Sequence, residues 1–153
     1  VELEEEQCGL SSAEAAMDAS ATSDALGDAL VALGSFDVIG LVFSASWCSS
    51  CRFVEPQLIR SYENLRKRGD RIQLCFVSAD ADKAEFDAHR AKLPWPALPF
   101  DEGIVSASLN ERFHVSSVPA VVLLKSDGSL ISTDGVRLLR QHARAFPWSV
   151  PPP

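Results

Sequence analysis

The most constraining feature of the sequence is a cysteine pair, Cys48 and Cys51, between a continuous apolar run and a helical pattern. The apolar run at 38–43 has the length and composition of a buried central strand. From 47 to 68, apolar side chains recur at helical spacing and indicate one buried face. A C-x-x-C at this junction puts its first cysteine at a helix N-terminus, where free N–H groups and the helix dipole favour a thiolate.

The rest of the chain alternates between strand and helix patterns. Apolar runs predict further strands at 72–77, 120–124 and 130–133. Helical patterns are found at 26–33, 82–92, 105–113 and 136–146. Asp127-Gly128 is a hairpin signal between the last two strands. This order of elements predicts a three-layer α/β/α domain with a central mixed sheet.

Charge and length divide the chain into unequal parts. The net charge of −7 arises in the first 28 residues, which contain eight acids and no Lys or Arg. We therefore expect an acidic extension at 1–25, either disordered or a short helix, a domain at 26–150, and a proline tail at 151–153. The roughly neutral remainder offers no basic face for nucleic acid, and its longest apolar run is too short to span a bilayer. We expect a cytoplasmic monomer.

The cysteine pair has two chemical interpretations, a metal half-site or a redox pair. A zinc site needs more ligands, but Cys8 lies in the polar leader and Cys75 in a strand-like run, where burial in the core is the usual role. In the redox interpretation Cys48 is the nucleophile that attacks a disulfide, and Cys51 resolves the mixed disulfide. The only cofactor expected is then the redox-active disulfide Cys48–Cys51 itself.

Two neighbouring features favour the redox interpretation. Trp47 adjoins the first cysteine and can shield one side of it, although core packing is the alternative role for this ring. Val118-Pro119 immediately precedes a predicted strand, where an ordinary trans proline at a strand start is the alternative. A third segment, 93–100, contains three prolines and predicts a fixed loop in which Trp95 has a structural role.

The three histidines give a weaker signal. His89 and His142 fall on amphipathic helical patterns, where exposure on the surface is expected. His114 comes shortly before Val118-Pro119 and could lie near a substrate groove. None of them shows the pattern of a Cys-His hydrolase, so a peptidase is not indicated.

Several motifs together resemble the tryparedoxin and nucleoredoxin branch of the thioredoxin superfamily. In chain order they are Ser44-Ala45-Ser46-Trp47-Cys48-x-x-Cys51-Arg52, Pro56-Gln57-Leu58, Ala91-Lys92-Leu93-Pro94-Trp95, Leu98-Pro99-Phe100, Phe113-x-Val115-x-Ser117-Val118-Pro119 and Phe146-Pro147-Trp148. The resemblance covers residues 36–148 and implies a thioredoxin fold, dithiol–disulfide exchange and a cis peptide bond at Pro119. For tryparedoxins it further implies reduction by the low-molecular-weight dithiol trypanothione and transfer to peroxiredoxin-type peroxidases or other protein disulfide clients.

The chain departs from that pattern at positions around the expected groove. Ser49 and Ser50 stand where tryparedoxins usually have two prolines, and their hydroxyls can donate to the Cys48 sulfur. Ala79 replaces a tryptophan, Ser116 a glutamate, and Asp134 lies where basic residues are common. These changes concern the substrate, and they motivate an alternative function: a thioredoxin-fold interaction module with vestigial exchange activity.

One departure concerns proton transfer. Many compact thioredoxins have a buried aspartate six residues before the first cysteine, and Val42 occupies that position here. Proton transfer to and from Cys51 then requires another route, through water or through a carboxylate such as Asp80. The alternative for Asp80 is a solvated loop residue or a helix cap.

Overall fold

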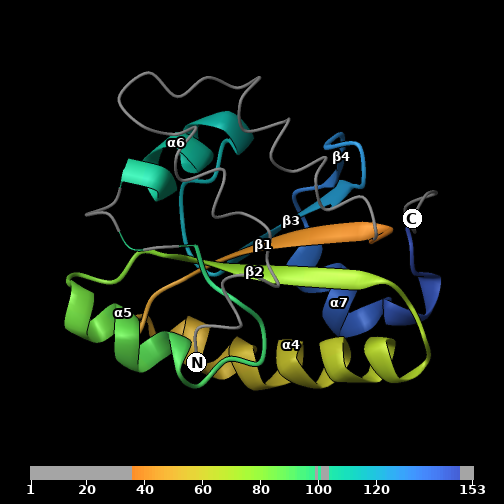
Figure 1. Cartoon of the computed structure of the whole chain (residues 1–153), viewed down its shortest axis with the longest axis horizontal. Coiled ribbons are helices and arrows are strands. Elements are labelled where there is room, and N and C mark those ends of the chain that lie inside the picture. The colour runs from red at the N-terminus through yellow and green to blue at the C-terminus, as the bar shows by residue number, and fades with distance from the viewer. Residues whose placement is uncertain (1–35, 99, 101–103, 149–153) are drawn as a thin grey trace.

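A four-stranded mixed sheet forms the centre of the molecule (Figure 1). The computed structural model describes residues 36–98, 100 and 104–148, so the predictions for 1–25, 26–33 and 151–153 lie outside the described residues. The strands, in the spatial order β2-β1-β3-β4, are β2 (Ile72–Ser78), β1 (Val38–Ser44), β3 (Ala120–Lys125) and β4 (Leu130–Ser132). β1 pairs in parallel with β2, and β3 pairs antiparallel with β1 and β4. The predicted hairpin is confirmed, and Gly128 in its turn adopts φ 88°, which suits glycine.

Helices cover both faces of the sheet. They are α4 (Ser49–Lys67), α5 (Lys83–Arg90), α6 (Ile104–Phe113) and α7 (Gly135–Gln141), followed by the short 3₁₀ helix η1 (Ala143–Ala145). α6 lies on one face, and α4, α5 and α7 lie on the other (Figure 1). The three-layer α/β/α architecture with a mixed sheet is therefore confirmed. The last predicted helix is shorter than expected, because His142 leaves helical geometry with φ −130° and ψ 32°.

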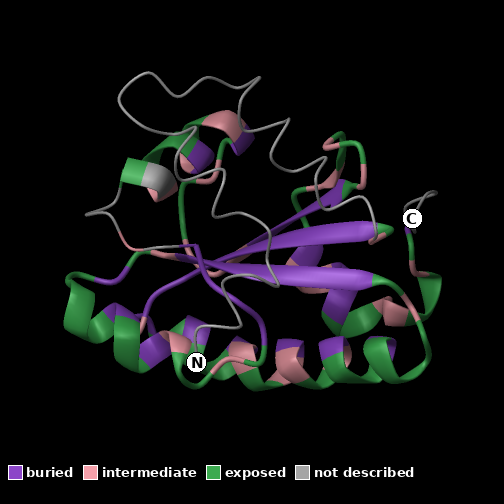
Figure 2. Ribbon diagram, in the orientation of Figure 1, coloured by how far each residue is buried: buried purple, intermediate pink, exposed green. Residues whose placement is uncertain are grey.

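Alternation along the strands builds two apolar layers. In β1, Ile39, Leu41 and Phe43 pack toward α6, whereas Val38 and Val42 pack toward α4 and α7. All seven residues of β1 are buried, as a central strand covered on both faces requires (Figure 2). Cys75 on β2 is fully buried in the α6 layer, and its sulfur is disulfide-bonded, which the sequence did not indicate.

α4 is the long helix that begins at the cysteine pair. Its buried face is formed by Cys51, Val54, Leu58, Tyr62 and Leu65, and the helix continues through Pro56. Phe53, which the apolar pattern assigned to this face, is instead 68% exposed. Successive residues differ by about 100° around a helix, so Phe53 cannot share a face with Val54.

The proline-rich loop after α5 is held against the core, as predicted. Trp95 is buried and packs edge-on against Tyr62, with ring centroids 5.4 Å apart. The Phe76 N–H donates to the Pro96 carbonyl at 2.8 Å, and the Leu98 N–H donates to the Phe76 carbonyl at 2.9 Å. These bonds fasten the loop to the free edge of β2.

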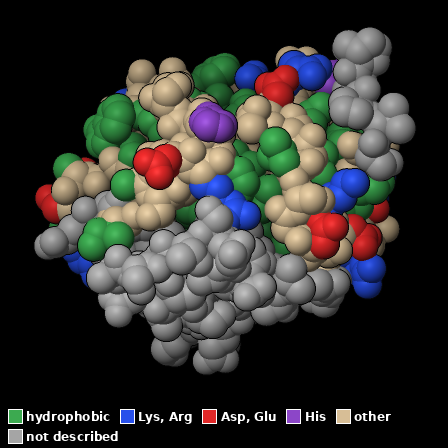
Figure 3. Space-filling view, turned by 90° about the horizontal axis from the view of Figure 1, so that it is seen from above, with side chains coloured by type: hydrophobic (Ala, Val, Ile, Leu, Met, Phe, Trp, Pro, Cys, Tyr) green, Lys and Arg blue, Asp and Glu red, His purple; other side chains and the backbone are tan. Residues whose placement is uncertain are grey.

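The surface on the α6 side carries charges of both signs. Acidic and basic side chains are interspersed among apolar and uncharged ones on the described part of this face (Figure 3). Among the described helices, none combines the length and the apolar character needed to cross a membrane.

Candidate active site

The cysteine pair lies where β1 ends and α4 begins. Cys48 is the N-cap residue of α4, and the Cys51 N–H donates to its Sγ at 3.2 Å. Both cysteines are free thiols. Cys48 retains 8% of its surface and Cys51 none, so the two sulfurs differ in access although they share one helical turn.

Burial has the largest effect on the pKa of the Cys51 thiol. It raises the pKa of the Cys51 thiol to about 11, and the hydrogen bond and charge of Cys48 add to the rise. A hydrogen bond with the Ser44 hydroxyl and another with the Ala45 backbone act in the opposite direction. Near neutral pH Cys51 is therefore a thiol, and any reaction of its sulfur requires removal of a proton.

The Val118-Pro119 segment closes over the first cysteine. The Cys48 Sγ–H donates weakly to the Val118 carbonyl, with 3.8 Å between the atoms, and the Val118 side chain packs on the cysteine cluster. The Val118–Pro119 peptide bond is cis, as is Phe146–Pro147. The structure thus brings Val118 and Pro119 to the cysteines across 70 residues of sequence.

Trp47 stands at the open side of the pair. Its side chain is largely exposed, which rules out the alternative of core packing. The indole Nε1–H donates to the Ala79 carbonyl at 2.9 Å and so ties the β1–α4 turn to the end of β2. Ser49 and Ser50 are exposed in the first turn of α4.

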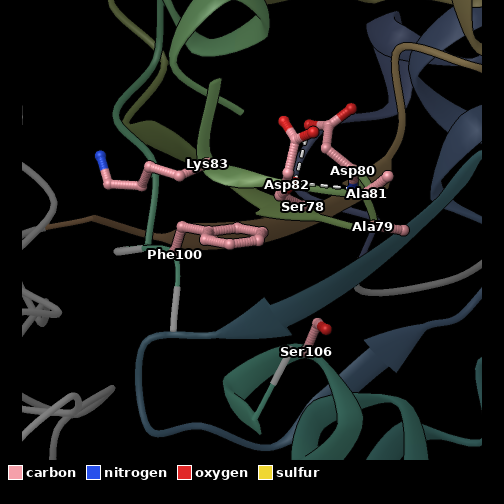
Figure 4. Close-up of a pocket in the computed structure, with 8 residues that line it drawn as sticks. All are labelled: Ser78, Ala79, Asp80, Ala81, Asp82, Lys83, Phe100 and Ser106. Carbon is pink, nitrogen blue, oxygen red and sulfur yellow. Dashed lines mark hydrogen bonds between the residues drawn. The ribbon is translucent and has the colours of Figure 1, made fainter. Parts of the chain in front are cut away.

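Two hollows adjoin this open side. The smaller, of about 210 Å³, lies among Trp47, Ala79, Ser116 and Val118. The larger, of about 730 Å³, extends toward Phe100 and is drawn in Figure 4, which shows Ala79 and Ser106 on its border. Ser78, Ala79 and Ser106 line both hollows, which together form a groove that ends at Trp47 and Val118, the neighbours of Cys48.

Behind the pair lies a closed side built from buried polar side chains. Asp80 connects it to the larger hollow, which it lines, and the Asp80 side chain is neither solvated nor a helix cap. This side chain is fully buried, and the cap of α5 is Asp82 instead. Asp80 accepts from the Ser46 N–H at 2.6 Å and from the Ser78 hydroxyl at 2.7 Å (Figure 4 shows the Ser78 bond). Burial pushes the pKa of Asp80 upward, but these bonds and the charge of His89 outweigh burial and lower it.

His89 was expected on the surface, and that prediction is wrong. Its ring is buried, with Nδ1 3.2 Å from Asp80 Oδ2 and Nε2 2.7 Å from Glu55 Oε2. Burial alone would lower the pKa of His89, but the bond and charge of Glu55, followed by those of Asp80, raise it above its ordinary value. The spacing of Phe86 and His89 on one face of α5 is the only sequence signal for this inward orientation.

Glu55 and Ser44 complete the closed side, and sequence reasoning assigned a role to neither side chain. Ser44, fully buried at the end of β1, donates through Oγ to Glu55 Oε2, the same oxygen that faces His89.

The other two histidines are not part of this cluster: His114 is exposed, with φ 57°, and His142 is half-buried after α7. In the part of the chain that the structure describes, no group of three or more His, Cys, Asp and Glu side chains is arranged to hold a metal ion.

Comparison with known proteins agrees with this fold. A family model described as thioredoxin-like matches residues 35–130. Probable nucleoredoxin 3 from Arabidopsis thaliana is 37% identical over 112 residues, which are 72% of this chain and 28% of that protein. Probable nucleoredoxin 2 from Oryza sativa subsp. japonica is 34% identical over 113 residues, 73% of this chain and 29% of that protein.

Solved structures of tryparedoxins are also similar to this chain. Tryparedoxin II from C. fasciculata superposes with a TM-score of 0.70 at 33% identity, covering 78% of this chain and 79% of that one. The chain belongs to the tryparedoxin and nucleoredoxin branch of the thioredoxin superfamily. It spans less than a third of the length of the two nucleoredoxins.

Proposed function

We propose that the protein is a thiol–disulfide oxidoreductase that cycles between a Cys48/Cys51 dithiol and a disulfide. The observation that carries this proposal is the asymmetry of the pair. Cys48 caps a helix, accepts the Cys51 N–H at 3.2 Å and lies next to Trp47 and Val118, which line a groove, whereas Cys51 is fully buried. An amide and a helix N-terminus directed at a sulfur stabilise a thiolate there.

The reaction has two exchange steps. The Cys48 thiolate attacks one sulfur of a client disulfide, a mixed disulfide forms, and the other client sulfur leaves as a thiolate that takes up a proton. Cys51 then loses its proton and attacks Cys48 Sγ, the mixed disulfide breaks, and the second client sulfur leaves and is protonated. The client gains two electrons and two protons, and the protein is left with a Cys48–Cys51 disulfide.

The groove beside Cys48 supports protein disulfides as the clients. An extended segment can lie between Trp47 and Val118, and Ala79 leaves room that an aromatic side chain would fill. A solved structure of tryparedoxin II is complexed with glutathionylspermidine. We therefore include a low-molecular-weight dithiol such as trypanothione as reductant and peroxiredoxin-type peroxidases as clients, with the protein acting as a cytoplasmic monomer.

Reduction of insulin by dithiothreitol tests the exchange activity. We expect the wild-type protein to accelerate insulin precipitation and Cys48→Ser to show only the background rate, because the attacking sulfur is gone. Ser108→Ala, an exposed change on α6 away from the pair, is the matched control and should behave as wild type. Equal rates for wild type and Cys48→Ser would refute the proposal and favour the interaction module.

A further inference from the structure

We propose that Ser44, Glu55 and His89 form a buried relay that removes the proton from Cys51 and delivers it to solvent through a pocket separate from the substrate groove. This inference rests on the proposed exchange function and specifies how its second step proceeds. Asp80 stands at the far end of the relay, where it holds His89, rather than beside the cysteine.

The contacts form a continuous chain. Cys51 and Ser44 share a hydrogen bond, and Ser44 Oγ donates to Glu55 Oε2. His89 Nε2 lies 2.7 Å from that same oxygen, and its Nδ1 lies 3.2 Å from Asp80. The links come from β1, α4, α5 and the turn after β2, so four separate segments converge behind one sulfur.

The second exchange step creates the need for this chain. With a pKa of about 11, only roughly one Cys51 in ten thousand is a thiolate at pH 7. No water-filled surface touches the sulfur, because Cys51 is fully buried. A hydrogen-bonded acceptor that takes the proton as the sulfur attacks avoids a free thiolate in an apolar site.

The transfer balances without any further reactant. The Cys51 proton moves to Ser44 Oγ while the Ser44 proton moves to the Glu55 carboxylate. The Cys51 sulfur bonds to Cys48 Sγ, and the client thiolate that leaves takes a proton from solvent. Glu55 returns its proton to solvent, so the relay is regenerated in each turnover.

An exit for the proton is present behind the pair. A pocket of about 540 Å³ lies between α4 and α5, and both Glu55 and His89 line it. Glu55 keeps 13% of its side-chain surface exposed there, while Ser44 and Cys51 have none. None of the residues that line this pocket lines either hollow of the groove, so the proton has an exit separate from the surface offered to a client.

The structure shows which charged groups surround the relay. The titratable and charged groups that face Glu55 and His89, or border their pocket, are Cys51, Asp80, Arg52, Glu85 and Lys92. Arg52 is engaged with the Ser46 carbonyl at 2.6 Å, and Glu85 with the Ala81 N–H at 3.3 Å. Ser44 hydrogen-bonds to Glu55, and Glu55 in turn contacts His89.

Rapid mixing of the reduced protein with 5,5′-dithiobis(2-nitrobenzoate) separates the two steps. The first equivalent of thionitrobenzoate reports attack by Cys48, and the second reports resolution by Cys51; Cys48→Ser supplies the background. We expect Glu55→Gln to slow the second release about 100-fold at pH 7 and to leave the first unchanged. The deficit should shrink as the pH approaches the pKa of Cys51, where the base is no longer needed.

Ser44→Ala and Glu63→Gln complete the test. Ser44→Ala breaks the link without removing a charge and should reproduce the selective, pH-dependent slowing. Glu63→Gln makes the same charge change at an exposed position of α4 and should match wild type. Normal second release in Glu55→Gln and Ser44→Ala, or a slowing equal at every pH, would overturn the relay. Loss of both releases in Cys48→Ser would still support the exchange function.

Discussion

The two sides of the cysteine pair are built in opposite ways. On the open side, Trp47 is 60% exposed, Ala79 and Val118 line a groove, and Cys48 retains 8% of its surface. On the closed side, every described contact of His89 and Asp80 is internal, and Cys51 is fully buried. Two thiols in one helical turn can therefore have different roles: Cys48 attacks a disulfide at the surface, and Cys51 resolves the mixed disulfide from a buried position.

Loss of the resolving thiol should have the largest effect. In Cys51→Ser the open side is intact, so Cys48 still attacks, but the mixed disulfide has no internal nucleophile to break it. We expect turnover to stop and a client to remain attached to Cys48. Mass spectrometry of complexes recovered without reductant measures this, and Cys48→Ser should give none. Full turnover by Cys51→Ser would remove the distinction between the two sides.

The two tryptophans near the site should separate function from stability. Trp95→Ala removes a buried ring packed on Tyr62 and should lower the free energy of unfolding by about 3–5 kcal/mol. Trp47→Ala removes an exposed ring and should change it by about 0.5 kcal/mol or less, while weakening exchange with protein clients. Urea unfolding followed by circular dichroism measures both changes. Equal losses of unfolding free energy in the two variants would contradict the separate roles of Trp47 and Trp95.

The closed side should also give a pH-dependent stability. His89 has a raised pKa in the folded protein because Glu55 and Asp80 face it, so folding binds its proton more tightly. Its contribution is complete below its unfolded value of 6.5 and is lost as pH rises through the folded pKa. The stability advantage of wild type over His89→Gln should therefore be larger at about pH 5.5 than at about pH 9. A constant difference in urea midpoint across this range would contradict the assignment.

The smallest effect is expected in the groove. Ala79→Trp fills the hollow beside Cys48 but leaves the pair and the closed side untouched. We expect a severalfold fall in kcat/KM for a protein disulfide and no change in the first release from 5,5′-dithiobis(2-nitrobenzoate). Ala107→Trp, an exposed change on α6, is the control. Equal effects on large and small disulfides would mean that the hollow does not receive the client.

The parts that were predictable are those governed by local pattern. The runs at 38–43, 72–77 and 120–124 became β1, β2 and β3, because strands covered on both faces have continuous apolar sequences of about this length. The helical spacing after Cys48 predicted α4, although it misplaced Phe53, which lies about 100° from the buried face. The cysteine pair itself was visible as a spacing at a strand-to-helix junction.

The closed side was decided by tertiary structure alone. Ser44 and Glu55 are 11 residues apart, and Glu55 and His89 are 34 apart, with no periodicity connecting them. A histidine on an amphipathic helix is read as exposed unless its partners are known, and burial of His89 is tolerable only because two carboxylates from other segments reach its ring. The sequence by itself determined the strands, the helices and the position of Cys48 and Cys51; only the packing of α4 and α5 on the sheet decided which charges stand behind them, because paired charges, unlike apolar runs, leave no local pattern.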